Sequence, residues 1–320
     1  MKKRMTRRET TLHLSIIAIL FAAQFILPPF HHSMLTRIMV LTTYAIGYNL
    51  LLGYTGLMSL GHAMLFSTGL YSVGLTVRYL GFEPFPAYFL AMLASLTISF
   101  VVGAIALRTS GVFFLIVTMI FSQVFYLTTL YFNSITYGDQ GFVISQYLRK
   151  VDLGFFQIDF ADNVVKYNLS LLIFSIAFMI SLYVSRSNLG LVLAAIRENP
   201  DRVEMLGYNT YRYKLLSFTL SGTVAGIAGG MYALVFSYVG SSFAFILNSI
   251  NPLLWTLLGG TGTTTGPLVG TMLMTYIIDL TSSFTESYLV VVGLALILIT
   301  LGFPRGIMGT VKKRWLPWLP

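Results

Sequence analysis

Long apolar runs separated by short polar segments are the dominant pattern along this chain of 320 residues. Most runs are continuous over about 20 residues, the length that an α-helix needs to cross the hydrocarbon core of a bilayer. The runs do not alternate apolar and polar positions, which argues against a membrane-spanning β-barrel. The stretches are 14–30, 35–52, 57–77, 87–107, 111–131, 168–185, 214–238, 247–259, 265–281 and 287–303. The sequence therefore predicts an all-α, polytopic helical membrane protein with about ten transmembrane helices.

These stretches divide into two halves of five, so we expect two pseudo-repeated halves within a single transmembrane domain at 14–304. The stretch 247–259 is short enough to enter and leave the membrane on the same side. Eight spans are therefore the alternative.

Basic residues predict the orientation, because cytoplasmic loops of membrane proteins are enriched in Lys and Arg. Five of them precede the first apolar stretch: Lys2, Lys3, Arg4, Arg7 and Arg8. That stretch has no small-residue cleavage site, so we interpret it as a retained span and not as a signal peptide. Counting from a cytoplasmic N-terminus at 1–13, the segment 186–213 and the basic tail 305–320 are also cytoplasmic. The loop 132–167 then lies outside.

The amino-acid composition excludes cysteine chemistry and argues against nucleic-acid binding. Only 10% of the residues are charged and 56% are hydrophobic, and the chain has no cysteine. Disulfides, a cysteine nucleophile and cysteine-based metal sites are thereby excluded. The net charge of +9 lies beside apolar stretches, which fits membrane topology better than nucleic-acid binding.

Motifs for ATP hydrolysis and for intramembrane catalysis are missing from the sequence. The segment LGGTGTTTGP at 258–267 lacks the Gly-Lys-Ser/Thr ending with which a P-loop holds nucleotide phosphates. The apolar stretches contain neither a His–carboxylate cluster nor a pair of Asp residues, which an intramembrane enzyme would need. Asp279 and Glu286 lie at the ends of stretches, so a proton- or sodium-driven carrier is less favoured. A stand-alone secondary transporter or channel remains the alternative to a subunit that depends on partners.

A charged segment, AIRENPDRVEMLGYNTYRYK at 195–214, interrupts the apolar pattern. It carries the signals of a short helix of about two turns: a polar N-cap, a proline at the first helical position, an acidic first turn and a terminating glycine. These residues are Asn199, Pro200, Asp201 and Gly207. Apolar side chains give the helix a second face, formed by Val203, Met205 and Leu206. An ordinary solvated loop is the alternative.

Glycine-rich sequences occupy the third stretch of each half, GLMSLGHAMLFSTG in the first and GGTGTTTGPLVG in the second. Helix interruptions at corresponding positions point to a translocation path near the midplane, since irregular backbone in a membrane lines cavities. Close packing and hydrogen bonds between helices are the alternatives. The candidate path residues are Asn49, Ser59, His62, Thr118, Gln123, Gly259, Gly262, Thr263 and Gly266.

Two other sets of residues have simpler interpretations. Gly222, Gly226 and Gly230 form small-xxx-small motifs and are predicted to pack against another helix. His62 has no second His or carboxylate at ligand spacing, so we predict no metal site there.

Three segments resemble, in the same order, the LivM-type permeases of branched-chain amino-acid ABC importers. They are NLLLGYTGLMSLGHAMLFSTGLYSVGL (49–75), AIRENPDRVEMLGYNTYRYKLLSFTLSGTVAGIAGGMYA (195–233) and LLWTLLGGTGTTTGPLVGTMLMT (253–275). A fourth, VTMIFSQVFYLTTLYFNSITYGDQGF (117–142), is similar more loosely. The resemblance implies a type II importer-like fold and a transport subunit that is not itself an enzyme.

The resemblance also implies partners. A second homologous permease would complete a heterodimer, with a homodimer as the alternative, and a soluble external binding protein would deliver the substrate. ATP and Mg would bind to two cytoplasmic ATPase subunits, so this chain would bind no cofactor. The resemblance places such a protein in the bacterial cytoplasmic (inner) membrane.

In this family the charged helix is the coupling element that docks in a cleft of an ATPase subunit. The positions that match are Arg197, Glu198, Asn199, Pro200, Asp201 and Gly207. Side-chain chemistry adds Arg202 as a polar contact and Val203 and Leu206 as apolar contacts to the cleft.

The resemblance implies Leu, Ile and Val as substrates, with urea or short amides as alternatives because related permeases serve them. We expect the groups that recognise a zwitterion to lie mainly on the binding protein. The path through the permease is then expected to be permissive.

Overall fold

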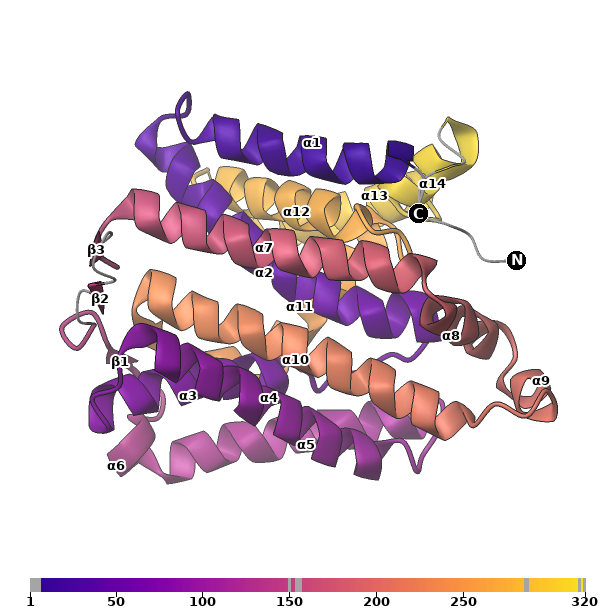
Figure 1. The fold of residues 1–320 in the computed structure, drawn as a ribbon, viewed down its shortest axis with the longest axis horizontal. Helices are drawn as coiled ribbons and strands as arrows, with labels where there is room; N and C mark the ends of the chain where they lie inside the picture. The colour runs from indigo at the N-terminus through magenta and orange to yellow at the C-terminus, as the bar shows by residue number, and fades with distance from the viewer. Residues whose placement is uncertain (1–6, 149–150, 153–156, 285–287, 316–317, 319–320) are drawn as a thin grey trace.

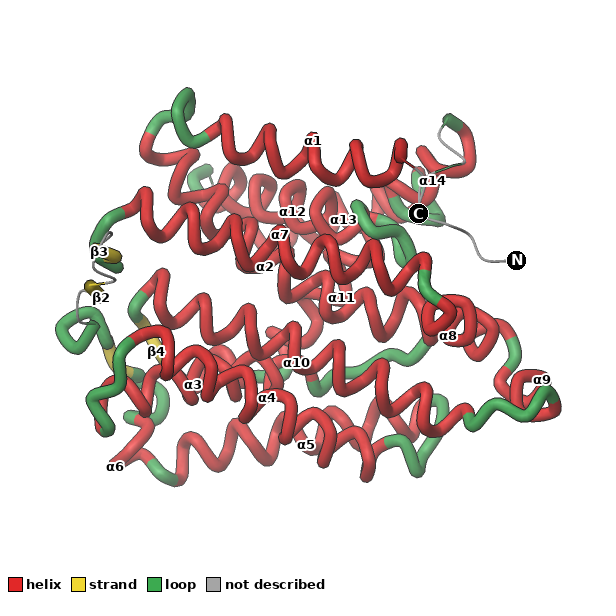
Figure 2. The backbone as a smooth tube through the Cα atoms, viewed as in Figure 1, coloured by secondary structure: helices red, strands yellow, loops and turns green. Residues whose placement is uncertain are grey.

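Apolar helices packed side by side make up most of the structure, a computed structural model that describes residues 7–148, 151–152, 157–284, 288–315 and 318. Figure 1 and Figure 2 show that the long helices run along roughly one axis. The strands in the described part of the chain are short, and they lie at one end of the helices.

Ten helices overlap the ten apolar stretches of the sequence. They are α1 (Arg7–Ala23), α2 (Pro29–Thr55), α3 (His62–Tyr79), α4 (Pro84–Ala106), α5 (Val112–Tyr131), α7 (Asn163–Arg186), α10 (Thr210–Phe236), α11 (Leu247–Gly259), α12 (Gly266–Ser282) and α13 (Tyr288–Gly302). The shorter elements are α6 (Asn133–Thr136), α8 (Asn188–Glu198), α9 (Pro200–Met205), α14 (Ile307–Arg314), the 3-10 helix η1 (Ser241–Ala244), β1 (Phe142–Val143), β2 (Val151–Asp152), β3 (Gln157–Ile158) and β4 (Tyr238–Val239).

Five of the helices in the described residues are long and apolar enough to cross a membrane: α2, α4, α5, α7 and α10. The prediction of an all-α membrane protein is confirmed at this level. Helices α11 and α12 have 13 and 17 residues, so they are shorter than a straight crossing requires. The count of ten crossings and the layout in two repeated halves stay predictions.

The start of the chain differs from the sequence-based division. Helix α1 begins at Arg7, inside the segment 1–13 assigned to a cytoplasmic N-terminus, and it ends at Ala23 instead of residue 30. Glu9 and His13 lie within α1 and are only 2% and 0% exposed. Contacts with distant parts of the chain bury these two polar residues, and such contacts leave no trace in an apolar pattern.

Helices α2 and α10 form the centre of the bundle. In their most apolar windows 89% and 72% of the residues are buried, against 33% in α4 and 22% in α5. The more exposed helices are also the more apolar, with window hydropathies of 2.3 and 1.9 against 1.3 and 1.4. Lipid is as apolar as a protein core, so this distribution fits α4 and α5 on a lipid-facing side.

Small residues let α10 approach its neighbours closely. A Cβ added at Gly226 would lie 1.9 Å from Ser95 Oγ of α4, and one at Gly222 would lie 2.4 Å from Ser99 Cβ. At Gly230 the nearest atom, on Tyr88, would be 3.2 Å away. The three glycines that the sequence assigns to packing therefore all lie at the contact between α10 and α4.

The two ends of the bundle carry different elements, as Figure 1 shows. At one end β1 pairs with β4 and β2 pairs with β3, both antiparallel, beside α6. At the other end lie the start of α1, the helices α8 and α9, and α14. The segment 186–213 and the described residues 305–315 thus share one end, and the described residues of the loop 132–167 lie at the opposite end.

Candidate functional site

The charged segment folds into two consecutive helices, α8 and α9, which project from the end of the bundle between α7 and α10 (Figure 1). Asn199 separates them, because its extended backbone (φ −160°, ψ 101°) ends α8. Its side-chain oxygen accepts a hydrogen bond from the backbone N–H of Arg202 at 3.0 Å, and Pro200 takes the first helical position. The N-terminal signals read from the sequence therefore act as expected.

Helix α9 ends after six residues, so it is slightly shorter than the two turns expected. Gly207 follows with φ +85°, and its N–H donates to the carbonyl of Glu204 at 2.8 Å. A left-handed glycine after the last turn satisfies carbonyls that the helix leaves unpaired. The carboxylate of Glu204 accepts a hydrogen bond from the hydroxyl of Thr210, which ties α9 to the start of α10.

The surface that α9 offers differs in one respect from the prediction. Val203, expected to fill a partner's cleft, is 5% exposed and packs within this chain. Met205 and Leu206 are 86% and 76% exposed, so they form the available apolar surface. The charged residues Glu198, Asp201 and Arg202 are also exposed. We call Met205, Leu206 and these three charged residues the α9 surface.

Arg197 faces its own chain. Its Nη1 donates a hydrogen bond to the carbonyl of Gly53, in the last turn of α2, at 2.7 Å. A Cβ added at Gly56 would lie 3.0 Å from Arg197 Cγ, and one added at Gly262 would lie 3.3 Å from Arg197 Nη1. Arg197 thus connects α8 to α2 and to the turn between α11 and α12, although it is itself exposed; its role in coupling stays a prediction.

The glycine- and threonine-rich turn, residues 260–265, breaks the helix as the sequence predicts. Gly260 and Gly262 adopt φ values of +119° and +71°, which favour glycine. The amide of Asn49, fully buried in α2, holds this turn: it donates to the carbonyl of Thr263 and accepts from the N–H of Gly262, both at 2.9 Å. A Cβ added at Gly259 would lie 1.9 Å from the carbonyl oxygen of Gly266. The turn is a tightly packed joint.

The remaining candidate path residues also occupy packed positions. Ser59, His62 and Thr118 are fully buried. His62 Nε2 pairs with Ser221 Oγ at 2.8 Å, and Thr118 Oγ1 accepts from the backbone N–H of Leu60 at 3.2 Å. The hydroxyl of Ser59 accepts from the backbone N–H two residues later, at 3.1 Å. Gln123 is half-buried in α5.

A cavity among the described residues lies away from these positions. It has a volume of about 680 Å³ and is lined by α2, α10, α11 and α12, with Phe66 of α3 and Phe243 of η1. Pro29 at the start of α2 and Phe236 at the end of α10 belong to its lining, so it lies toward the end that carries the strands. None of the nine candidate path residues lines it. Outside this cavity they lie among packed helices, and their assignment to a translocation path stays a prediction.

Sequence reasoning missed the charged and amide side chains of this cavity, which are Arg37, Asn248, Asn251 and Asp279. Arg37 was visible as a charge inside the apolar stretch 35–52, and the two Asn residues lie inside 247–259. Polar residues within apolar stretches are the signal that could have found them. Within the described part of the chain, no group of three His, Cys, Asp or Glu is placed to hold a metal ion.

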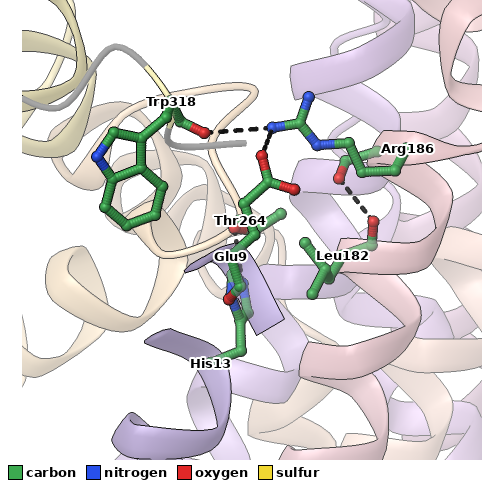
Figure 3. A network of polar contacts seen from close by, with 7 residues as sticks. Glu9, His13, Leu182, Arg186, Thr264 and Trp318 are labelled. Carbon is green, nitrogen blue, oxygen red and sulfur yellow. Dashed lines mark hydrogen bonds and ion pairs between the residues drawn. The ribbon is translucent and has the colours of Figure 1, made fainter. Parts of the chain in front are cut away.

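A polar network ties together the end of the bundle that carries α8 and α9, opposite the cavity (Figure 3). His13 pairs through Nδ1 with the carbonyl of Glu9 at 2.8 Å and through Nε2 with Thr264 Oγ1 at 2.9 Å. The carboxylate of Glu9 forms an ion pair with Arg186, the last residue of α7, which also donates to the carbonyl of Trp318 at 3.4 Å. The start of α1, the 260–265 turn and the entry to α8 are thereby connected.

This chain matches the model of one known protein family. Residues 31–301 match the family model described as the permease component of branched-chain amino acid transport systems. This chain belongs to that family. The match covers Arg197, the α9 surface and all of the cavity lining except Pro29 and Phe30.

Curated relatives agree with the family and with the LivM-type resemblance. The high-affinity branched-chain amino acid transport system permease protein LivM of Salmonella typhimurium is 25% identical, over 97% of this chain and 77% of its own length. LivM of Escherichia coli is 25% identical over 87% and 70%. A probable branched-chain amino acid transport permease protein, LivH of Methanocaldococcus jannaschii, is 31% identical over 43% and 47%. No solved structure matches this chain significantly.

Proposed function

We propose that this chain is the membrane-spanning permease subunit of an ATP-driven importer. It translocates branched-chain amino acids inward from a soluble binding protein, and a separate ATPase subunit supplies the energy. The observation that carries this proposal is α9, a capped helix that projects from the bundle and exposes the apolar side chains of Met205 and Leu206. Exposed apolar groups beside charges are typical of a surface that another protein covers.

The proposal assigns the chain four kinds of partner or environment. Two cytoplasmic ATPase subunits bind ATP and Mg²⁺, because this sequence has no P-loop. A second homologous permease forms a heterodimer with this chain, and an external binding protein delivers the substrate. The complex lies in the bacterial cytoplasmic membrane, with both termini of this chain in the cytoplasm.

Arg197 connects the helices that carry the α9 surface to the transmembrane helices, so movement of α9 can be transmitted to them. A closing ATPase can bias the permease only if it binds the two permease states differently, so α8 and α9 must move as a unit with the transmembrane helices. The hydrogen bond from Arg197 to Gly53 joins α8 to α2, and α2 holds the 260–265 turn through Asn49. Movement of α9 is thereby conveyed to α2 and to the joint between α11 and α12.

Arg197→Ala is expected to reduce ATP hydrolysis stimulated by the loaded binding protein without preventing assembly. The change removes a charged hydrogen bond whose contribution is up to about 1.5–3 kcal/mol, and it leaves the α9 surface intact. ATPase activity of the reconstituted complex measures the effect. Arg212→Ala, at an exposed position in α10, is the matched control. Normal stimulation in Arg197→Ala would contradict this route.

The orientation can be tested with single cysteines, because the chain has none. Gln146, shortly after β1, and Glu198, the last residue of α8, are both exposed, and β1 and α8 lie at opposite ends of the bundle in Figure 1. On intact cells an impermeant maleimide is expected to label Gln146→Cys and to leave Glu198→Cys unmodified until the membrane is opened. Labelling of Glu198→Cys on intact cells would contradict a cytoplasmic α9.

Crosslinking tests the proposed partner directly. Leu206→Cys, treated with a short bifunctional thiol–amine reagent, is expected to yield a product with a co-purified ATPase subunit that mass spectrometry identifies. Ile135→Cys, 47% exposed in α6 at the opposite end, is the control and should yield no such product. A complex that transports substrate while Leu206→Cys never crosslinks to an ATPase would refute the proposal.

A further inference from the structure

The cavity near the strand end contains two opposite charges on different helices. Arg37 of α2 and Asp279 of α12 both line it. Charges within membrane-spanning helices are costly in lipid, and they are found where they face a protein interior or a water-filled cavity. Their presence on one cavity wall therefore indicates that this side of the bundle does not face lipid.

Arg37 and Asp279 do not neutralise each other. Both residues line the same cavity, and among the described residues neither side chain takes part in a salt bridge, so the two charges are not within ion-pair distance of each other. A ligand that carries both a negative and a positive group can satisfy both charges at once. A neutral ligand would leave two charged groups unmatched, and such groups are expensive to desolvate.

The rest of the lining is suited to an apolar side chain beside a polar head group. Tyr44, Phe66 and Trp255 provide aromatic surface, and the amides of Asn248 and Asn251 lie on α11 in the same cavity. Tyr44 donates its hydroxyl to the carbonyl of Asn248 at 3.1 Å, which fixes the aromatic wall against the amides. A volume of about 680 Å³ lies within the range of about 300–1,000 Å³ that small-molecule sites have.

We propose that this cavity is a substrate-binding site of the permease for a zwitterionic amino acid with an apolar side chain. The guanidinium of Arg37 donates to the α-carboxylate, and the carboxylate of Asp279 accepts from the α-ammonium group. The aromatic wall contacts the side chain. This assignment rests on the proposed function, and it gives the permease its own recognition of the zwitterion, contrary to the permissive path expected from the sequence.

Equilibrium binding of radiolabelled L-leucine to the complete complex in nanodiscs, without binding protein and without ATP, tests the site. Isocaproate, which lacks the ammonium group, and isoamylamine, which lacks the carboxylate, serve as competitors. Wild type is expected to prefer leucine over both. Arg37→Gln and Asp279→Asn should each weaken leucine binding about tenfold or more, the size of a lost charged hydrogen bond.

The competitors show whether a variant has lost recognition of one charged group of leucine or binds every ligand more weakly because the cavity is disturbed. Arg37→Gln should lose the preference for leucine over isoamylamine, and Asp279→Asn should lose the preference over isocaproate. Arg108→Gln and Glu83→Gln, at exposed positions outside the cavity, are matched controls that should bind like wild type. Weaker binding with an unchanged ranking of the competitors would overturn the assignment, as would unchanged leucine affinity in both variants.

Two further outcomes keep this inference separate from the proposed function. Wild-type complex that binds urea or acetamide but no leucine would overturn the site assignment while leaving an ATP-driven permease intact. Wild-type complex that shows the expected selectivity but no ATP-driven uptake would support the site and contradict the proposed function.

Discussion

Met205→Asp combined with Leu206→Asp is expected to abolish substrate-stimulated ATP hydrolysis and uptake in a chain that still folds and inserts. Both side chains are mainly exposed, at 86% and 76%, so the substitutions disturb little of this chain's own packing. In the complex the two carboxylates would be buried in an apolar cleft without partners. Removing a charge from water without pairing it costs several kcal/mol, enough to prevent docking of the ATPase.

ATPase activity and uptake, measured in the same proteoliposomes with and without loaded binding protein, read out this effect. Ile135→Asp is the control, because it places the same charge at an exposed apolar position at the opposite end of the bundle. It should keep stimulation and uptake. Full stimulation in the double variant would show that α9 is an ordinary solvated connection.

Gly69→Ala is expected to prevent recovery of a folded complex. A Cβ at Gly69 of α3 would lie 1.9 Å from the carbonyl oxygen of Gly226 in α10 and 2.6 Å from its carbonyl carbon. These are backbone atoms, so α3 and α10 would have to move apart along their whole contact. Overpacking typically costs about 1–3 kcal/mol and occasionally more, and we expect the upper end here. Yield of monodisperse protein and thermal unfolding in detergent measure the loss.

Two other glycine-to-alanine variants serve as controls for Gly69→Ala. Gly293→Ala, where no atom lies within 4 Å of the added Cβ, should behave like wild type. Gly226→Ala meets the side chain of Ser95, with Oγ at 1.9 Å and Cβ at 2.2 Å, so adding Ser95→Gly should restore part of its stability. No side-chain substitution can relieve Gly69→Ala in this way. A stable Gly69→Ala protein would contradict the packing of α3 against α10.

Local features of this fold could be predicted from the sequence because their causes are local. Apolar stretches of helical length overlap α1 to α5, α7 and α10 to α13, since the length of an apolar run reflects the helix it forms. The ends of α9 were predictable from Asn199, Pro200 and Gly207, because capping depends on side chains within one turn. The breaks at Gly260 and Gly262 have the same kind of cause.

Contacts between distant residues were not predictable. No sequence pattern shows the hydrogen bond between Asn49 and Gly262, which joins segments 213 residues apart in a packed joint. An interruption rich in glycine is compatible with a cavity or with close packing, and only tertiary structure distinguishes the two. Likewise, Val203 and Arg197 are close in sequence to the α9 surface, yet one is buried and the other binds Gly53 of α2.

The measurement that tests the central claim most directly is leucine uptake by the purified complex in proteoliposomes, with ATP enclosed on the ATPase side and loaded binding protein outside. One set carries an active ATPase subunit and a matched set carries a subunit that binds but cannot hydrolyse ATP. We predict accumulation of leucine against its gradient in the first set alone, and none with this chain in the absence of ATPase. Equal accumulation in both sets, or by this chain alone, would contradict an ATP-driven permease and indicate a stand-alone transporter.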